Sequence, residues 1–125
     1  MTHILLVDDE NIQRDIIEMF LIKSIKIPPP LHFYHAKNGN QAIRQVVEHE
    51  ELDFIIMDIT MPDCNGIEAT KLIRKINKKV LIYACTAEHE DIKKECLEAG
   101  MNGFFTKPFK TDYGIKINWE IFNKV

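Results

Sequence analysis

Near its start the chain reads Ile4-Leu5-Leu6-Val7-Asp8-Asp9, a short apolar run that leads directly into two acidic residues. An unbroken apolar run of this length is typical of a strand buried on both faces of a parallel sheet. Similar runs recur at residues 31–36, 54–57, 80–85 and 103–105. Each gap between runs has room for one helix, which predicts the order βαβαβαβαβ followed by a C-terminal tail.

Apolar residues recur at helical spacing in each gap between the predicted strands. The four groups are Ile12, Ile16, Met19 and Phe20; Ala42, Val46 and Val47; Ile67, Leu72, Ile73 and Ile76; and Ile92, Cys96 and Leu97. Asn38-Gly39 is a turn signal before the second helix, and Gly66 and Gly100 fall near expected element ends. We therefore expect an α/β fold, a doubly wound five-stranded parallel sheet with strand order 2-1-3-4-5.

Composition limits the class of protein. The chain has 125 residues, 46% of them apolar, which predicts one globular domain over residues 1–125. A net charge of −3 argues against direct binding of nucleic acid or of an anionic membrane. The three cysteines have neither disulfide-framework nor zinc-site spacing, so we expect a cytoplasmic protein. The first apolar run is too short for a signal peptide or a membrane span.

Two segments allow alternatives. Three prolines at positions 28–30 must end the first helix by Ile27, and they form either a stiff connection or a short polyproline ligand, of which we favour the connection. In the tail from residue 112 onward, Ile115, Trp119 and Phe122 lie on one helical stripe, yet the same stretch also alternates like a strand. We favour a helix, because a helix would close the doubly wound layer.

Reactive side chains follow the predicted strands. In an open parallel sheet such groups collect at the carboxyl ends of the strands, near the point where the strand order reverses. Asp8 and Asp9 follow the first strand, Asp58 ends the third, Thr86 ends the fourth, and Lys107 comes just after the fifth. Because the first and third strands are neighbours in the expected order, the three acids should crowd together. Carboxylates in such a cluster suit Mg²⁺, and Lys107 would add positive charge.

Each of these residues also has an ordinary structural interpretation. Asp8 or Asp9 is placed to cap the helix that begins near Asn11, Thr86 is placed to cap the fourth helix, and Lys107 alone would be a surface lysine. Capping does not account well for five such groups at successive strand ends, so we favour a shared site.

These residues also carry a resemblance to a known family. Residues 4–10 (ILLVDDE), residues 57–66 (MDITMPDCNG), Thr86-Ala87 and residues 103–109 (GFFTKPF) resemble the receiver domains of two-component response regulators, in order and at the matching strand ends. The resemblance covers residues 3 to about 110. It implies a flavodoxin-like fold and transfer of a phosphoryl group from a phosphohistidine, on a sensor kinase or phosphotransfer protein, to Asp58.

The same resemblance implies roles for the other residues. Asp9, Asp58 and the backbone carbonyl of Thr60 would bind Mg²⁺, with Asp8 acting through water, while Thr86 and Lys107 would contact the phosphoryl group. Thr60 and Glu88 match positions that tune dephosphorylation. Phe104 resembles the switch aromatic, although it could equally be a core phenylalanine. A downstream effector would bind the fourth helix, the fifth strand and the C-terminal element. The long proline connection and the tail depart from the family pattern.

Two other functions compete with a phosphoacceptor. A phosphatase of the haloacid dehalogenase type also forms an aspartyl phosphate, but it needs an acid two residues after the nucleophile, where this chain has Thr60. A receiver-like module that acts without phosphorylation would not need Asp8, Asp9, Asp58, Thr86 and Lys107 together. We therefore expect a signalling phosphoacceptor rather than an enzyme, with at most self-catalysed phosphorylation and dephosphorylation.

Overall fold

The computed structural model describes residues 1–23, 30–59, 65–86 and 92–106. The elements of these residues, in chain order, are β1 (Thr2–Val7), α1 (Asn11–Ile22), β2 (Leu31–Ala36), α2 (Gly39–Glu48), β3 (Phe54–Asp58), α3 (Gly66–Ile76), β4 (Leu81–Thr86), α4 (Lys93–Ala99) and β5 (Gly103–Thr106). The order βαβαβαβαβ expected from the sequence is confirmed. Helix α1 ends at Ile22, before the prolines, as expected. The tail from residue 112 onward, and Pro28 and Pro29, lie outside the described residues.

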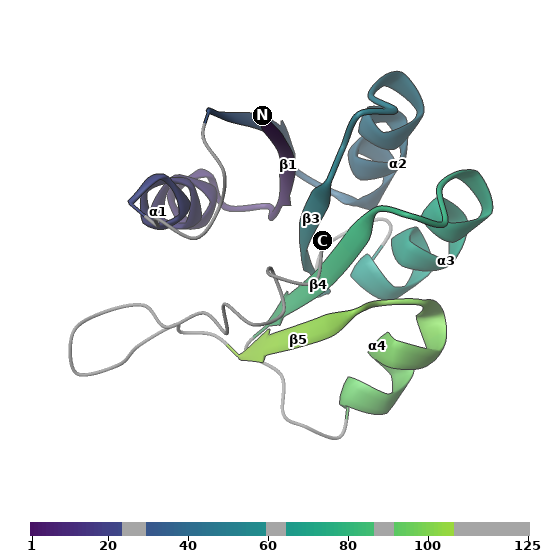
Figure 1. Ribbon diagram of the computed structural model, residues 1–125. Helices are drawn as coiled ribbons and strands as arrows, with labels where there is room; N and C mark the ends of the chain where they lie inside the picture. Colours follow the sequence, from purple (N-terminus) through teal and green to yellow (C-terminus); the bar gives the residue numbers. More distant parts are fainter. Residues whose placement is uncertain (24–29, 60–64, 87–91, 107–125) are drawn as a thin grey trace.

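The strands form one sheet in the order β2-β1-β3-β4-β5, and every neighbouring pair is parallel. The predicted doubly wound α/β fold is therefore confirmed. Helix α1 covers one face, and α2, α3 and α4 cover the other (Figure 1). All five residues of β3 are buried, which explains why the central strand reads as an unbroken apolar run.

Two apolar clusters hold the layers together. On the α1 side, Ile17 and Leu21 pack with residues of β1, β3 and β4. On the other side, a larger cluster joins the sheet to α2, α3 and α4 through Val46, Ile73 and Cys96. Within the described part of the chain, no helix is long and apolar enough to cross a membrane.

Helix boundaries follow from local chemistry. Asn38 caps α2 by accepting a hydrogen bond from the Gln41 amide at 2.8 Å, which confirms the turn signal. Asn65 caps α3 in the same way through the Glu68 amide at 2.9 Å. Helix α4 ends at Ala99 and is capped by Gly100, whose φ of 111° lies in the left-handed region that favours glycine.

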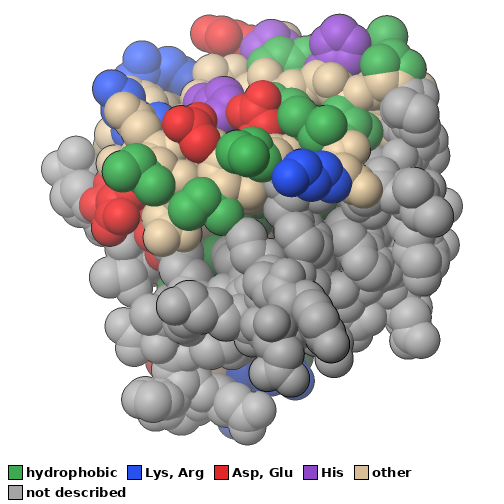
Figure 2. Space-filling model, turned by 90° about the vertical axis from the view of Figure 1, so that its left-hand side faces the viewer, with side chains coloured by type: hydrophobic (Ala, Val, Ile, Leu, Met, Phe, Trp, Pro, Cys, Tyr) green, Lys and Arg blue, Asp and Glu red, His purple; other side chains and the backbone are tan. Residues whose placement is uncertain are grey.

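In α1 the apolar residues at helical spacing do not mark the buried face. Ile12, Ile16 and Met19 are 70%, 37% and 57% exposed, whereas Ile17 and Leu21 are buried. A helix packed on a sheet can bury only one stripe, and here that stripe also contains Arg14. Ile12, Ile16, Met19 and Ile22 lie on the solvent side, and the side chain of Phe20 lies outside the described residues. Figure 2, which views the molecule from the α1 side, shows hydrophobic side chains interspersed with acidic ones there.

The apolar groups of the other helices are also only partly buried. Val47, Leu72, Ile76 and Leu97 are exposed, whereas the small side chains Ala42, Ala69 and Ala99 are buried. Small residues allow a helix to approach its neighbours closely, so apolar spacing alone does not identify which residues of a helix are buried.

Candidate functional site

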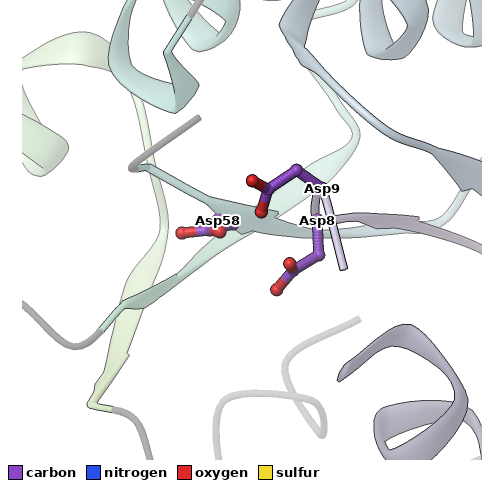
Figure 3. Close-up of side chains that lie close together, drawn as sticks. All are labelled: Asp8, Asp9 and Asp58. Atoms are coloured by element: carbon purple, nitrogen blue, oxygen red, sulfur yellow. The ribbon is translucent and has the colours of Figure 1, made fainter. Parts of the chain in front are cut away.

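The acidic site is built by the ends of two neighbouring strands. Strands β1 and β3 pair with Val7 opposite Met57, so the next residues, Asp8 and Asp58, emerge side by side. Asp9 follows directly. Figure 3 shows the three side chains together at the carboxyl ends of β1 and β3. Each offers a carboxylate oxygen, and these oxygens lie within 4.8 Å of one another, which confirms that the sheet brings the three acids together.

The three acids differ in exposure. Asp8 and Asp58 are 2% and 6% exposed, whereas Asp9 is open to solvent. Like charges this close repel one another, and the effect is strong where burial reduces screening by water. The cluster therefore has the composition and access of a site for a hard divalent cation, with buried carboxylates beneath and an exposed one at the mouth.

The backbone around Asp8 is fixed from several sides. Its amide donates to the carbonyl of Ala36 at 3.1 Å, which extends the β1–β2 ladder by one residue. Its Oδ1 accepts a hydrogen bond from the Glu10 amide at 2.9 Å. Glu10 is the residue before α1 and its own side chain makes no capping bond. Asp8 thus stabilises the turn into α1, and neither Asp8 nor Asp9 is the cap residue of that helix.

Gly66 sets the position of Asp58. It is the first residue of α3, and its amide donates to the carbonyl of Ile59 at 3.2 Å. A Cβ at this position would lie 2.4 Å from the Asp58 carbonyl oxygen and 2.7 Å from the Ile59 Cα. Only glycine allows α3 to begin this close to the end of β3. Sequence reasoning placed Gly66 near an element end but missed this close approach.

The other predicted site residues are only partly described. Thr86 is the last residue of β4, and the pairing of Asp58 with Cys85 places it just beyond the end of β3. Phe104 pairs with Ala84 on β5. The side chains of Thr86 and Phe104, and all of Thr60, Glu88 and Lys107, lie outside the described residues.

One residue of this region was missed from the sequence. Arg14 of α1 is 6% exposed, and its guanidinium donates to the Asp8 carbonyl oxygen and to Asn11 Oδ1. A signal was present, because Arg14 lies one and two helical turns before Ile17 and Leu21, the residues that α1 buries.

Neither of the two described cysteines has the surroundings of a reactive thiol. Cys85 and Cys96 are both buried, and burial, with a smaller contribution from the Glu95 carboxylate, raises the pKa of the Cys96 thiol. A thiol in such surroundings stays protonated and unreactive at neutral pH.

Comparison with known proteins gives consistent matches. The family model of the response regulator receiver domain matches residues 4–117. The chemotaxis protein CheY of Bacillus subtilis is 36% identical over 115 residues, covering 90% of this chain and 91% of that protein.

Two solved structures are informative relatives. The response regulator TrrA of Thermotoga maritima, in complex with Mg²⁺ and BeF, is 27% identical with a TM-score of 0.75, covering 90% of this chain and 92% of that chain. The receiver domain of Ssk1 from Saccharomyces cerevisiae, crystallised with the histidine phosphotransfer protein Ypd1, is 29% identical with a TM-score of 0.74, covering 98% of this chain and 84% of that chain.

Proposed function

The chain belongs to the response regulator receiver domains of two-component signalling and has a CheY-like fold, and on this premise we propose that residues 1–125 form one receiver domain whose phosphoacceptor is Asp58. The observation that carries the proposal is the position of Asp58. It ends β3 and is buried, and one of its carboxylate oxygens lies within 4.8 Å of a carboxylate oxygen of Asp8 and of Asp9.

The acid cluster fits Mg²⁺, because this ion prefers oxygen ligands, needs few carboxylates and keeps several waters. Asp9, Asp58 and the Thr60 carbonyl are its proposed direct ligands, and Asp8 acts through water. The bound ion would cancel the repulsion between the Asp58 carboxylate and an incoming anionic phosphoryl group. The complex of the related TrrA with Mg²⁺ and BeF supports this assignment.

The proposed reaction transfers one phosphoryl group. A carboxylate oxygen of Asp58 attacks phosphorus, the bond between phosphorus and the imidazole nitrogen of the donor breaks, and the imidazole leaves as a neutral ring after taking up a proton. The transition state is loose, so catalysis depends mainly on how the reacting groups are positioned and on how their negative charge is neutralised. Thr86 and Lys107 are the proposed contacts to the phosphoryl oxygens.

The donor would be a phosphohistidine on a sensor kinase or a phosphotransfer protein. The complex of the related Ssk1 receiver with Ypd1 supports a partner of this kind. Phosphorylation would change binding of an effector protein at α4, β5 and the C-terminal segment, with Phe104 and Thr86 as the switch. Thr60 and Glu88 would set the lifetime of the acyl phosphate. We place this activity in the cytoplasm, without direct contact to nucleic acid or membrane.

A direct test uses Mg²⁺ and a small acyl phosphate as donor, followed by intact-mass measurement. Wild-type protein should gain the mass of one phosphoryl group, and Asp58→Asn should gain none. Asp9→Ala should react far more slowly, because one proposed ligand is lost. An equal gain in Asp58→Asn or in excess EDTA would refute the proposal, and no gain in wild type would favour a module that acts without phosphorylation.

A further inference from the structure

Arg14 is a buried cation beside the acid cluster that the proposed reaction does not use. A guanidinium is costly to bury unless its N–H groups find acceptors. The structure supplies them: Nη1 donates to the carbonyl oxygen of Asp8, Nη2 to Oδ1 of Asn11, and Nε to Nδ1 of His35 at 3.2 Å. The planar donor fork of arginine thus connects the end of β1, the start of α1 and the edge strand β2.

The carbonyl that Arg14 holds belongs to the peptide bond between Asp8 and Asp9. Rotation of this peptide unit would move the Asp9 carboxylate relative to Asp58. The amide of Asp8 is already fixed by Ala36 and its Oδ1 by the Glu10 amide. The bond from Arg14 to the carbonyl therefore completes the restraint on the segment that carries both acids.

Arg14 is itself supported from behind. Because His35 Nδ1 accepts the hydrogen bond from Arg14, the imidazole proton lies on Nε2, which is 3.0 Å from Glu18 Oε2 and donates to it. Glu18 is one helical turn after Arg14 on α1. The chain Asp8–Arg14–His35–Glu18 thus runs from the acid cluster to the half-exposed outer surface between α1 and β2.

We infer that Arg14 is a positioning residue that orients the Asp8–Asp9 peptide so that the three acids can bind Mg²⁺. This rests on the proposed function only in assuming that the cluster binds the ion. Supporting groups behind metal ligands commonly contribute 10- to 100-fold to metal affinity. An alternative is that Arg14 only stabilises the first turn of α1 through Asn11, and the two roles differ in what they do to Mg²⁺ binding.

The test titrates unphosphorylated protein with Mg²⁺ alone and follows backbone amide resonances by NMR. Arg14→Met should weaken Mg²⁺ binding by about tenfold and should shift the metal-free amide resonances of Asp8 and Asp9. Phosphorylation with an acyl phosphate should then need about tenfold more Mg²⁺ but reach a similar rate at saturation. Arg14→Lys should fall between Arg14→Met and wild type, because an ammonium can reach one acceptor but not three in a plane.

Arg74→Met is the matched control. Arg74 is also a partly buried arginine on a helix, but it bonds to groups far from the acids, namely the carbonyls of Gly100, Asn77 and Val80 and Oδ1 of Asn102. Its loss should reduce stability and leave Mg²⁺ affinity unchanged. Equal weakening in Arg14→Met and Arg74→Met would overturn the inference, as would wild-type Mg²⁺ affinity or unshifted Asp8 and Asp9 resonances in Arg14→Met.

A second pair of variants tests the support from β2. In His35→Gln the side-chain amide can still accept from Arg14 and donate to Glu18, so Mg²⁺ affinity should stay near wild type. In His35→Phe both bonds are lost and affinity should fall. A protein that binds Mg²⁺ with this dependence on Arg14 but gains no phosphoryl group would refute the proposed function and leave the positioning role intact.

Discussion

At the scale of single residues, Gly66 allows α3 to begin close to the end of β3. A methyl group on Gly66 would meet the Asp58 carbonyl oxygen at 2.4 Å, and backbone atoms cannot move aside as a flexible side chain can. We expect Gly66→Ala to lower the free energy of unfolding by about 2 kcal/mol or more and to weaken Mg²⁺ binding, because the end of β3 must shift. Urea denaturation and a Mg²⁺ titration measure both effects.

Lys71→Ala is the control in the same helix. Lys71 makes an exposed ion pair with Glu68 at 3.7 Å, and such pairs contribute little. Its loss should change the free energy of unfolding by less than about 0.5 kcal/mol. If Gly66→Ala is as stable as Lys71→Ala, the close approach of α3 to β3 is not what holds Asp58 in place.

A second residue-scale prediction concerns alkaline pH. Burial raises the pKa of Tyr83 from 10.0 to about 12, because the phenolate is poorly solvated in the core. The folded protein therefore retains this proton at a pH where the unfolded chain releases it. The resulting stabilisation is complete below about pH 10 and is lost as pH rises towards 12.

The loss should be on the order of 2 kcal/mol for wild type, measured as the difference in urea stability between about pH 9 and pH 11.5. Tyr83→Phe keeps the ring but has no ionisable hydroxyl, so it should lose less over the same interval. Identical losses in the two proteins would mean that Tyr83 ionisation does not contribute to alkaline unfolding.

At the scale of secondary-structure elements, Arg74 links three of them. Its guanidinium bonds to Asn77 and Val80 before β4 and to Gly100 and Asn102 after α4, and Asn102 also accepts from the Ile82 amide of β4. Removing the guanidinium leaves partly buried carbonyls without these donors. We expect Arg74→Met to lower the free energy of unfolding by about 2–3 kcal/mol, and Arg74→Lys to restore only part of it. Full stability of Arg74→Met in urea denaturation would contradict this linking role.

Strands were easier to predict than helix faces. A strand segment buried on both sides is apolar, so residues 4–7 of β1 and 54–57 of β3 could be predicted directly from their composition. A helix buries a stripe, and the choice of stripe depends on which polar residues find partners. In α1 the buried stripe includes Arg14, whose acceptors Asp8 and His35 lie on other elements. Helical spacing of apolar residues carries no information about such partners.

At the scale of the whole molecule, the sheet order determines where the acids meet. The general rule for parallel sheets predicted that Asp8, Asp9 and Asp58 would lie together, and the pairing of β1 with β3 confirms it. The supporting contacts of Arg14 and the close approach at Gly66 could not be predicted, because both depend on the distance between elements. The roles of Thr86, Lys107, Thr60, Glu88 and Phe104 stay predictions.

The central claim is that Asp58 accepts a phosphoryl group. Borohydride reduces an acyl phosphate to an alcohol, so reduction after incubation with Mg²⁺ and a small acyl phosphate marks the acceptor, and peptide mapping by mass spectrometry locates it. The account predicts homoserine at position 58 alone, and only when Mg²⁺ is present. Homoserine at another aspartate instead, or equal conversion of Asp58 in excess EDTA, would contradict it.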